Sequence, residues 1–336
     1  MLYIFFLALY FCLVSARCND GIRIKRQTDI ELASNCSKIV GDLVVEESSL
    51  SEIDLSNIEQ IDGRIVISGN TGLASLKLDG LKSISKSFHI SGNGALVEFS
   101  AKSLSTSGGI FIIKNLSLKK VDLSSLSQAS ALQVISTSIT SLCVDNLSST
   151  RNIAINHNPS LQTISFQNLT SIKGDFFFNE NSIQELYLKN LKSIYGSLLM
   201  SGNENLFSIS MPELIKIGQG LILSTNMELK NIDEDAFPKL SSISASLDIS
   251  GDIDTFFLPA IRSIKWGFRI RSSGCLDCKS ISAQIEKYVH GEYVCRRSIF
   301  GIPGPGGVSS IDEYKFYSAG ACTATNAIQR DLSIPT

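Results

Sequence analysis

The sequence predicts an all-β fold, a right-handed parallel β-helix with about 11 coils of about 22 residues each. Three observations point to this class: a unit that recurs along the chain, apolar residues that alternate at the start of each unit, and an amide side chain at the turn that follows. The unit is clearest at Gly63–Ile84 and returns at Gly174–Ile194 and Gly196–Ile217. A fixed period of this length is typical of solenoids, in which each repeat packs only against its neighbours.

Each unit opens with a short strand in which every second residue is apolar, as at Ile65 and Ile67. This alternation places both apolar residues of a pair on the inner side of the sheet and the residue between them on the outer side. The second half of the unit has apolar residues at spacings of two and three, which favours short strands and corners over an outer helix. The units start at Gly41, Gly63, Lys86, Gly108, Ala131, Arg151, Gly174, Gly196, Gly218, Ala245 and Trp266.

The turn after the first strand carries a second repeated column. A side-chain amide at one turn position can hydrogen-bond the coils on either side and so satisfy backbone groups that the turn leaves unpaired. We therefore expect these side chains to form an internal ladder. Its predicted members are Asn70, Asn93, Asn115, Asn158, Asn181, Asn203, Asn226 and Asp252.

The two ends of the chain differ from the repeats. Residues 2–16 are apolar or small and end in Val-Ser-Ala, which predicts a secretory signal peptide at 1–16; a signal anchor is the alternative. An open solenoid needs caps, and we expect an N-terminal cap at 17–40, repeats at 41–274 and a cysteine-containing cap at 275–299. Within the second cap, Ser280–His290 has helical spacing. Glycine and proline then predict a flexible tail at 300–336.

Secretion decides how the cysteines are interpreted. In an oxidising compartment they are expected to form disulfides, and we expect Cys18 to pair with Cys36. The pairing among Cys275, Cys278, Cys295 and Cys322 stays open. Cys275, Cys278 and Cys295 with His290 also have the ligand types of a zinc site, although no metal or other cofactor is expected. Cys143 faces outward and is either a free thiol or a cross-link between two chains. Four N-glycosylation sequons fit the same route, at Asn35, Asn115, Asn146 and Asn168.

Composition excludes several functions. A net charge of -2 gives no basic excess for nucleic acid, and with 43% hydrophobic and 18% charged residues the chain is neither disordered nor, after the signal peptide, membrane-spanning. The three histidines, His89, His157 and His290, lie in no hydrolase or zinc-protease motif. No catalytic residue is predicted.

The best functional signal is the outward side of the first strands. An apolar column on an exposed sheet face is typical of a surface that contacts a partner or a polymer; the alternative is that the tail or a second copy of the chain covers it. The predicted partner face consists of Val66, Phe111, Phe177, Leu199 and Ile222.

The segment Asn35-Cys36-Ser37 with Ile39, Gly41 and Leu43, followed by these repeats, resembles the receptor L domains of insulin- and EGF-receptor ectodomains. The resemblance is closer to the fungal extracellular-mutant and sporulation-specific family of GPI-anchored cell-wall proteins, over about Cys18–Arg297, including a terminal group like Cys275, Cys278 and Cys295. It implies a receptor L-domain-like solenoid with no catalytic residues to carry over. It also implies a non-enzymatic role in organising the fungal cell wall or spore wall.

Three function hypotheses follow from these observations. The first is a secreted, glycosylated wall protein that contacts wall polysaccharide or wall proteins. The second is a receptor-type module that binds a soluble protein ligand, and the third is a polysaccharide-active enzyme. The sequence ends without the apolar run of a GPI signal. Two explanations of this ending stay open. Either the protein is released into the wall or periplasm, or the sequence is truncated.

Overall fold

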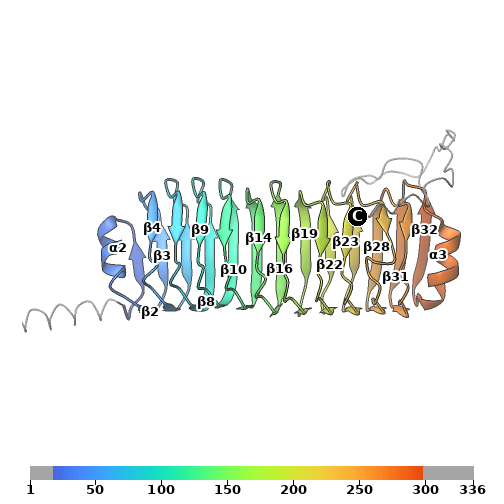
Figure 1. Ribbon diagram of the computed structural model, residues 1–336, viewed down its shortest axis with the longest axis horizontal. Helices are drawn as coiled ribbons and strands as arrows, with labels where there is room; N and C mark the ends of the chain where they lie inside the picture. Colours follow the sequence, from blue (N-terminus) through green and yellow to red (C-terminus); the bar gives the residue numbers. More distant parts are fainter. Residues whose placement is uncertain (1–17, 298–336) are drawn as a thin grey trace, which may run out of the picture.

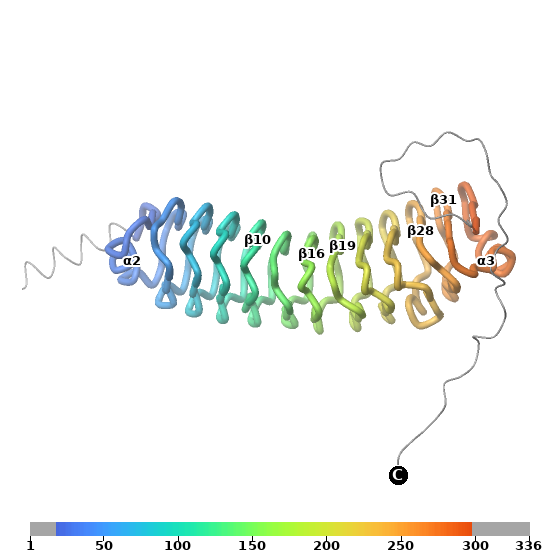
Figure 2. The backbone as a smooth tube through the Cα atoms, turned by 90° about the horizontal axis from the view of Figure 1, so that it is seen from above, coloured from blue at the N-terminus to red at the C-terminus, as the bar shows by residue number. Residues whose placement is uncertain are grey.

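The computed structural model describes residues 18–297 and shows a parallel β-solenoid (Figure 1). The strands stack side by side along a rod, with helix α2 (Gln27–Ala33) at one end and helix α3 (Cys278–Ile285) at the other. Seen from above, the coils follow one another in chain order between these helices (Figure 2). The predicted signal peptide, the predicted tail and Cys322 lie outside the described residues.

The first strands of the coils form one continuous parallel stack. Residues 18–297 contain 13 of them, two more than the repeat starts predicted. The extra strands, β1 and β32, belong to the caps, whose sequences lack the turn asparagine that marks seven of the other eleven coils. The stack consists of β1 (Ile22–Ile24), β3 (Leu43–Glu46), β6 (Ile65–Ser68), β8 (Ser83–Ser91), β10 (Thr106–Asn115), β13 (Ala131–Thr137), β16 (Asn152–Asn158), β19 (Phe176–Asn181), β22 (Leu198–Ser201), β25 (Leu221–Ser224), β28 (Ser246–Gly251), β31 (Gly267–Ser272) and β32 (Glu292–Arg297).

Two further strand columns complete the coils, as the spacing of apolar residues predicted. The second strands form smaller parallel sheets: β4 (Glu52–Asp54), β7 (Ser75–Lys77), β9 (Glu98–Ser100) and β11 (Lys120–Asp122); β14 (Ser141–Cys143) and β17 (Thr163–Ser165); β20 (Glu185–Tyr187) and β23 (Ser208–Ser210); β26 (Asn231–Ile232) and β29 (Thr255–Phe256). The third strands join the first-strand sheet: β2 (Lys38–Val40), β5 (Gln60–Asp62), β12 (Gln128–Ala129), β15 (Ser149–Thr150), β18 (Ser171–Ile172), β21 (Ser193–Ile194), β24 (Lys216–Ile217), β27 (Ser242–Ile243) and β30 (Ser263–Ile264).

The core is a continuous apolar column inside the coils. In β19, Phe176 and Phe178 are fully buried, whereas Phe177 between them is only half-buried. The parallel register aligns Phe176 with Leu198 and Phe178 with Met200, so like positions stack from coil to coil. The alternation seen in the sequence therefore predicts correctly which side chains lie inside.

The predicted asparagine ladder is present from Asn70 to Asn226. Each side chain donates from Nδ2 to a carbonyl of the preceding coil, as Asn203 does to Phe178 O at 2.8 Å. Its Oδ1 accepts from the preceding ladder residue, as Asn203 does from the backbone N–H of Asn181 at 3.0 Å. At one coil Thr137 takes the ladder position, and its hydroxyl donates to Asn158 Oδ1 at 2.7 Å.

The prediction that Asp252 continues the ladder is wrong. A carboxylate lacks the N–H donor that the neighbouring carbonyl needs, and its burial would cost far more free energy than burial of an amide. Asp252 instead lies at the surface, where its side chain accepts from Ser273 Oγ at 3.3 Å and pairs with Lys230 Nζ at 3.6 Å. The ladder therefore ends at Asn226.

Both caps are held by a disulfide. Cys18–Cys36 closes the loop that contains α2, as predicted. At the other end Cys278–Cys295 ties α3 to β32, which settles a pairing that the sequence left open. The helix begins two residues before the predicted Ser280 because Asp277 caps it, accepting from Lys279 N and Ser280 N. It ends at Ile285 rather than His290, and one 3₁₀ turn, η1 (Glu286–Tyr288), follows.

An ion pair between the first coils makes a testable contribution to stability. The side-chain hydrogen bonds from Arg64, and then the one from its backbone N–H, hold the pKa of Asp42 below its usual range. Because the folded-state pKa is lowered, this stabilisation is present above the ordinary value near 4 and is lost as the pH falls through the lowered pKa. Asp42→Asn should therefore have a lower unfolding free energy than the parent at pH 7.

That difference should shrink steadily below about pH 4. It should be small, because the Arg64 side chain is 55% exposed. Chemical denaturation at several pH values measures it, with Arg64→Ala as the matched control, which should show the same pH dependence. A difference that stays constant from pH 7 to pH 2.5 would contradict the assignment.

Candidate contact face

The outward residues of the first strands form a straight column, and five of its apolar members are named here the contact face: Val66, Phe111, Phe177, Leu199 and Ile222. The strand register places Phe177 opposite Leu199 and Leu199 opposite Ile222, so these three side chains are neighbours on consecutive coils. All three are half-buried, since each is flanked by the equivalent side chain of the next coil. The structure therefore brings these three predicted residues together.

Val66 and Phe111 lie further along the same column. Between them His89 stacks on Phe111, with the ring centroids 4.6 Å apart and the planes at 12°. Burial of the imidazole, and then the nearby Arg64 guanidinium, hold the pKa of His89 below its usual range, so the ring is neutral at pH 7. Gln133 and the buried Ala154 separate this group from Phe177–Ile222. The contact face thus consists of two apolar groups on one sheet.

Charged residues mark the C-terminal limit of the apolar column. Asp248 follows Ile222 in register, and Arg269 follows Asp248. Arg269 donates from Nη1 to Asp248 at 3.0 Å and from Nη2 to Glu292 at 3.2 Å. The apolar and charged parts of the sheet are therefore sharply divided, which is the pattern of a surface that contacts something less polar than water.

Three of the four sequons lie at exposed positions. Asn35 follows α2, and Asn146 and Asn168 follow the second strands of adjacent coils, on a different sheet from the contact face. Asn115 is fully buried in the ladder, and its Nδ2 donates to Ile90 O at 2.9 Å. An attached glycan at Asn115 is incompatible with this folded arrangement. Glycosylation at the other three positions stays a prediction.

Cys143 is a free, exposed cysteine on β14. Its Sγ donates to Asp145 Oδ2 at 3.3 Å. Partial burial, and then this hydrogen bond, raise the pKa of the thiol, so little reactive thiolate is present at neutral pH. Cys275 is disulfide-bonded. No group of three or more His, Cys, Asp or Glu side chains within residues 18–297 is arranged to hold a metal ion.

The three histidines lie far from one another in the chain and on separate coils. His89 is on β8, His157 is on β16, and His290 precedes β32. Among residues 18–297, no helix is both long and apolar enough to cross a membrane.

Comparison with known proteins identifies fungal relatives. Protein ecm33 of Aspergillus fumigatus is 26% identical over 330 residues, which cover 83% of this chain and 80% of that protein. A cell surface GPI-anchored protein of Arthroderma benhamiae is 25% identical over 322 residues, or 83% of this chain and 82% of the relative. Sporulation-specific protein 2 of Saccharomyces cerevisiae is 27% identical over 301 residues, covering 76% of this chain and 59% of its own length.

No family model matches the sequence, and no solved structure matches the fold. The three alignments nevertheless cover 83%, 83% and 76% of this chain. The family resemblance that the repeats and terminal cysteines predicted is thereby confirmed: over most of its length the chain is similar to fungal proteins that include a GPI-anchored cell-surface protein and a sporulation-specific protein.

Proposed function

We propose that this chain is a non-enzymatic, secreted and glycosylated protein of the fungal cell surface that contributes to the organisation and integrity of the cell wall or spore wall. The contact face carries this proposal: Phe177, Leu199 and Ile222 form an apolar strip on a regular sheet, where they can lie against wall polysaccharide or another wall protein. The name of one relative supports the location at the cell surface, and that of another supports a role in sporulation.

The names of two relatives, a cell surface GPI-anchored protein and a sporulation-specific protein, describe no enzymatic activity, and this supports a non-enzymatic role. The glycosylation predicted at Asn146 and Asn168 supports the same picture. These residues follow β14 and β17, whereas the contact face lies on the first-strand sheet. Glycans there would leave the contact face free.

The decisive experiment introduces charge into the contact face. Phe177→Asp combined with Leu199→Asp should leave the rod folded, because both side chains point outward, but should remove the protein from the wall fraction of cells. We expect at least a tenfold loss of wall-retained protein, since two desolvated carboxylates strongly disfavour an apolar contact. The measurement is a quantitative immunoblot of wall and medium fractions, with circular dichroism on the purified variant.

A matched control is available on the same two coils. Tyr187 and Ser210 are paired in register on the second strands, and both point outward. Tyr187→Asp combined with Ser210→Asp adds the same two charges at the same coil spacing, away from the contact face. Retention of this control with loss of the first variant supports the proposal. Equal retention of both variants sinks the contact-face assignment, and capture of one discrete soluble protein by the parent would favour the receptor-type function instead.

A further inference from the structure

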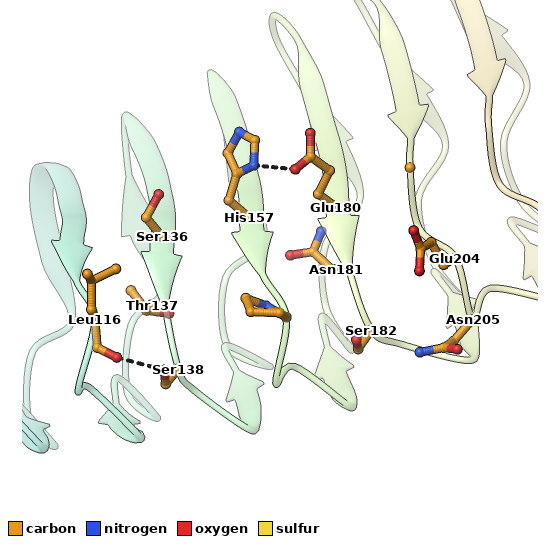
Figure 3. Close-up of a pocket in the computed structure, with 12 residues that line it drawn as sticks. Leu116, Ser136, Thr137, Ser138, His157, Glu180, Asn181, Ser182, Glu204 and Asn205 are labelled. Carbon is orange, nitrogen blue, oxygen red and sulfur yellow. Dashed lines mark hydrogen bonds and ion pairs between the residues drawn. The ribbon is translucent and has the colours of Figure 1, made fainter. Parts of the chain in front are cut away.

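A groove crosses five coils at the corners between the first and second strands (Figure 3). It has a volume of about 570 Å³ and runs from Leu116 to Asn205. It lies where the first strands end and the chain turns toward the second strands. None of the contact-face residues lines it. The groove is thus a second, separate feature of the rod.

Differences in corner length produce this hollow. Two residues separate the ladder position from the next core residue in most coils, as between Asn158 and Leu161. In two coils a single residue separates them: Ser138 after Thr137, and Ser182 after Asn181. The core residues on both sides remain buried throughout. The shorter corners therefore recede, and the longer corner that carries Pro159 stands between two notches.

The polar centre of the groove is a pair of side chains from adjacent coils. His157 Nδ1 lies 2.6 Å from Glu180 Oε2, and the two side chains point toward each other (Figure 3). Both residues have left-handed backbone conformations, with φ of 55° and 53°. Glycine occupies the same turn position in other coils, at Gly69 and Gly92.

Left-handed backbone is uncommon for residues other than glycine, yet this turn position also holds Glu47, Lys114, Ser136 and Thr225 in the same conformation, so the conformation of His157 and Glu180 belongs to the repeat. Glycine would satisfy the turn at both positions, so the backbone alone does not require an imidazole and a carboxylate there. On the next coil the position is Gly202, where an added Cβ would lie 3.0 Å from Glu180 Cγ. Gly202 therefore leaves the space that the Glu180 side chain occupies.

The walls combine apolar and polar groups. Leu116 is 67% exposed and Pro159 is exposed, while Ser182 and Asn205 supply a hydroxyl and an amide. No lysine or arginine lines the groove, so an anionic ligand lacks a counter-charge. Of the two lining carboxylates, that of Glu180 is already bonded to His157, which disfavours a metal ion or a cationic ligand.

A neutral sugar fits all of these features. Its pyranose C–H face can pack on exposed apolar side chains, and its hydroxyls can both donate to carboxylates and accept from amides. We propose that the groove between Leu116 and Asn205 binds a neutral oligosaccharide, with His157 and Glu180 as its central hydrogen-bonding pair. The proposal rests on the proposed function only in taking the wall as the source of that sugar.

The test measures binding of defined oligosaccharides to the purified protein by isothermal titration calorimetry. The probes are a β-1,3-glucan hexamer, a chitin hexamer and a mannan pentamer. They distinguish which of three wall polysaccharides supplies the neutral sugar. We expect the parent to bind at least one of them, and His157→Gly and Glu180→Gly each to weaken that binding at least tenfold. Because glycine relieves the left-handed strain, neither substitution should lower the thermal midpoint of unfolding.

Glu47 provides the matched control. It is a glutamate at the equivalent turn position of another coil, with φ of 52°, and it lies outside the groove. Glu47→Gly should leave oligosaccharide binding unchanged. The proposal is overturned if the parent binds none of the three probes at millimolar concentration, or if His157→Gly and Glu180→Gly bind as the parent does. The parent protein could fail to bind oligosaccharide while the Phe177→Asp, Leu199→Asp variant is still lost from the wall. That result would overturn the oligosaccharide-binding proposal and leave the proposed function standing.

Discussion

Asn203→Ala should destabilise the rod by roughly 3–5 kcal/mol, the cost of leaving two buried backbone groups unpaired together with a small cavity. Asn203 is fully buried, and its Nδ2 donates to Phe178 O at 2.8 Å. Its Oδ1 accepts the backbone N–H of Asn181 at 3.0 Å. Alanine removes both partners at a corner that is fully buried, so the two unpaired groups are shielded from bulk water.

Asn190→Ala is the control for this prediction. Asn190 also bonds a neighbouring coil, through Nδ2 to Gln167 O at 2.7 Å, but it lies at the surface, where water can take over. Its loss should cost less than about 1 kcal/mol. Guanidinium unfolding followed by circular dichroism compares the two. If Asn203→Ala and Asn190→Ala unfold at the same denaturant concentration, the ladder is not the stabilising element that its geometry indicates.

Phe178→Ala should have a comparably large effect, about 3–5 kcal/mol, because it removes a fully buried ring from the centre of the core. The ring lies 6.1 Å from that of Phe176 in an edge-to-face arrangement, and the register places Phe178 between Ile155 and Met200. The neighbouring coils are fixed by backbone hydrogen bonds and cannot collapse into the space. The resulting cavity should therefore remain.

Phe177→Ala is the matched substitution on the same strand. Its ring points outward, so its removal should change the unfolding free energy by less than about 1 kcal/mol while weakening retention at the wall. Thermal unfolding and hydrogen exchange measure the first effect, and cell fractionation measures the second. Similar losses of stability for Phe177→Ala and Phe178→Ala would contradict the assignment of inside and outside on β19.

Much of this architecture could be predicted from the residues because one rule repeats. Alternation in strands such as Phe176–Phe178 predicts the buried side, and the asparagine at most of the turns predicts the ladder. Prediction fails where a coil departs from the rule. The cap strands β1 and β32 lack the turn signal, and Asp252 keeps the spacing of the ladder but not its donor.

The groove illustrates the other kind of failure. Its residues match no chemical motif, and its shape depends on two corners that are each one residue short, at Ser138 and Ser182. That difference is visible in the sequence once the ladder and core positions are known. It becomes a hollow only when neighbouring coils are placed side by side, which a pattern read along one chain does not show.

The backbone hydrogen bonds between coils fix the advance of the rod at about 4.8 Å per coil, so 13 coils span about 58 Å between the outermost first strands. The length of this molecule can therefore change only in steps of one whole coil. Because each coil contacts only the one before and the one after, a whole coil can be gained or lost in the middle without disturbing either cap. Related proteins can thus change their reach across a surface by one such increment at a time, while the chemistry of every remaining coil stays the same.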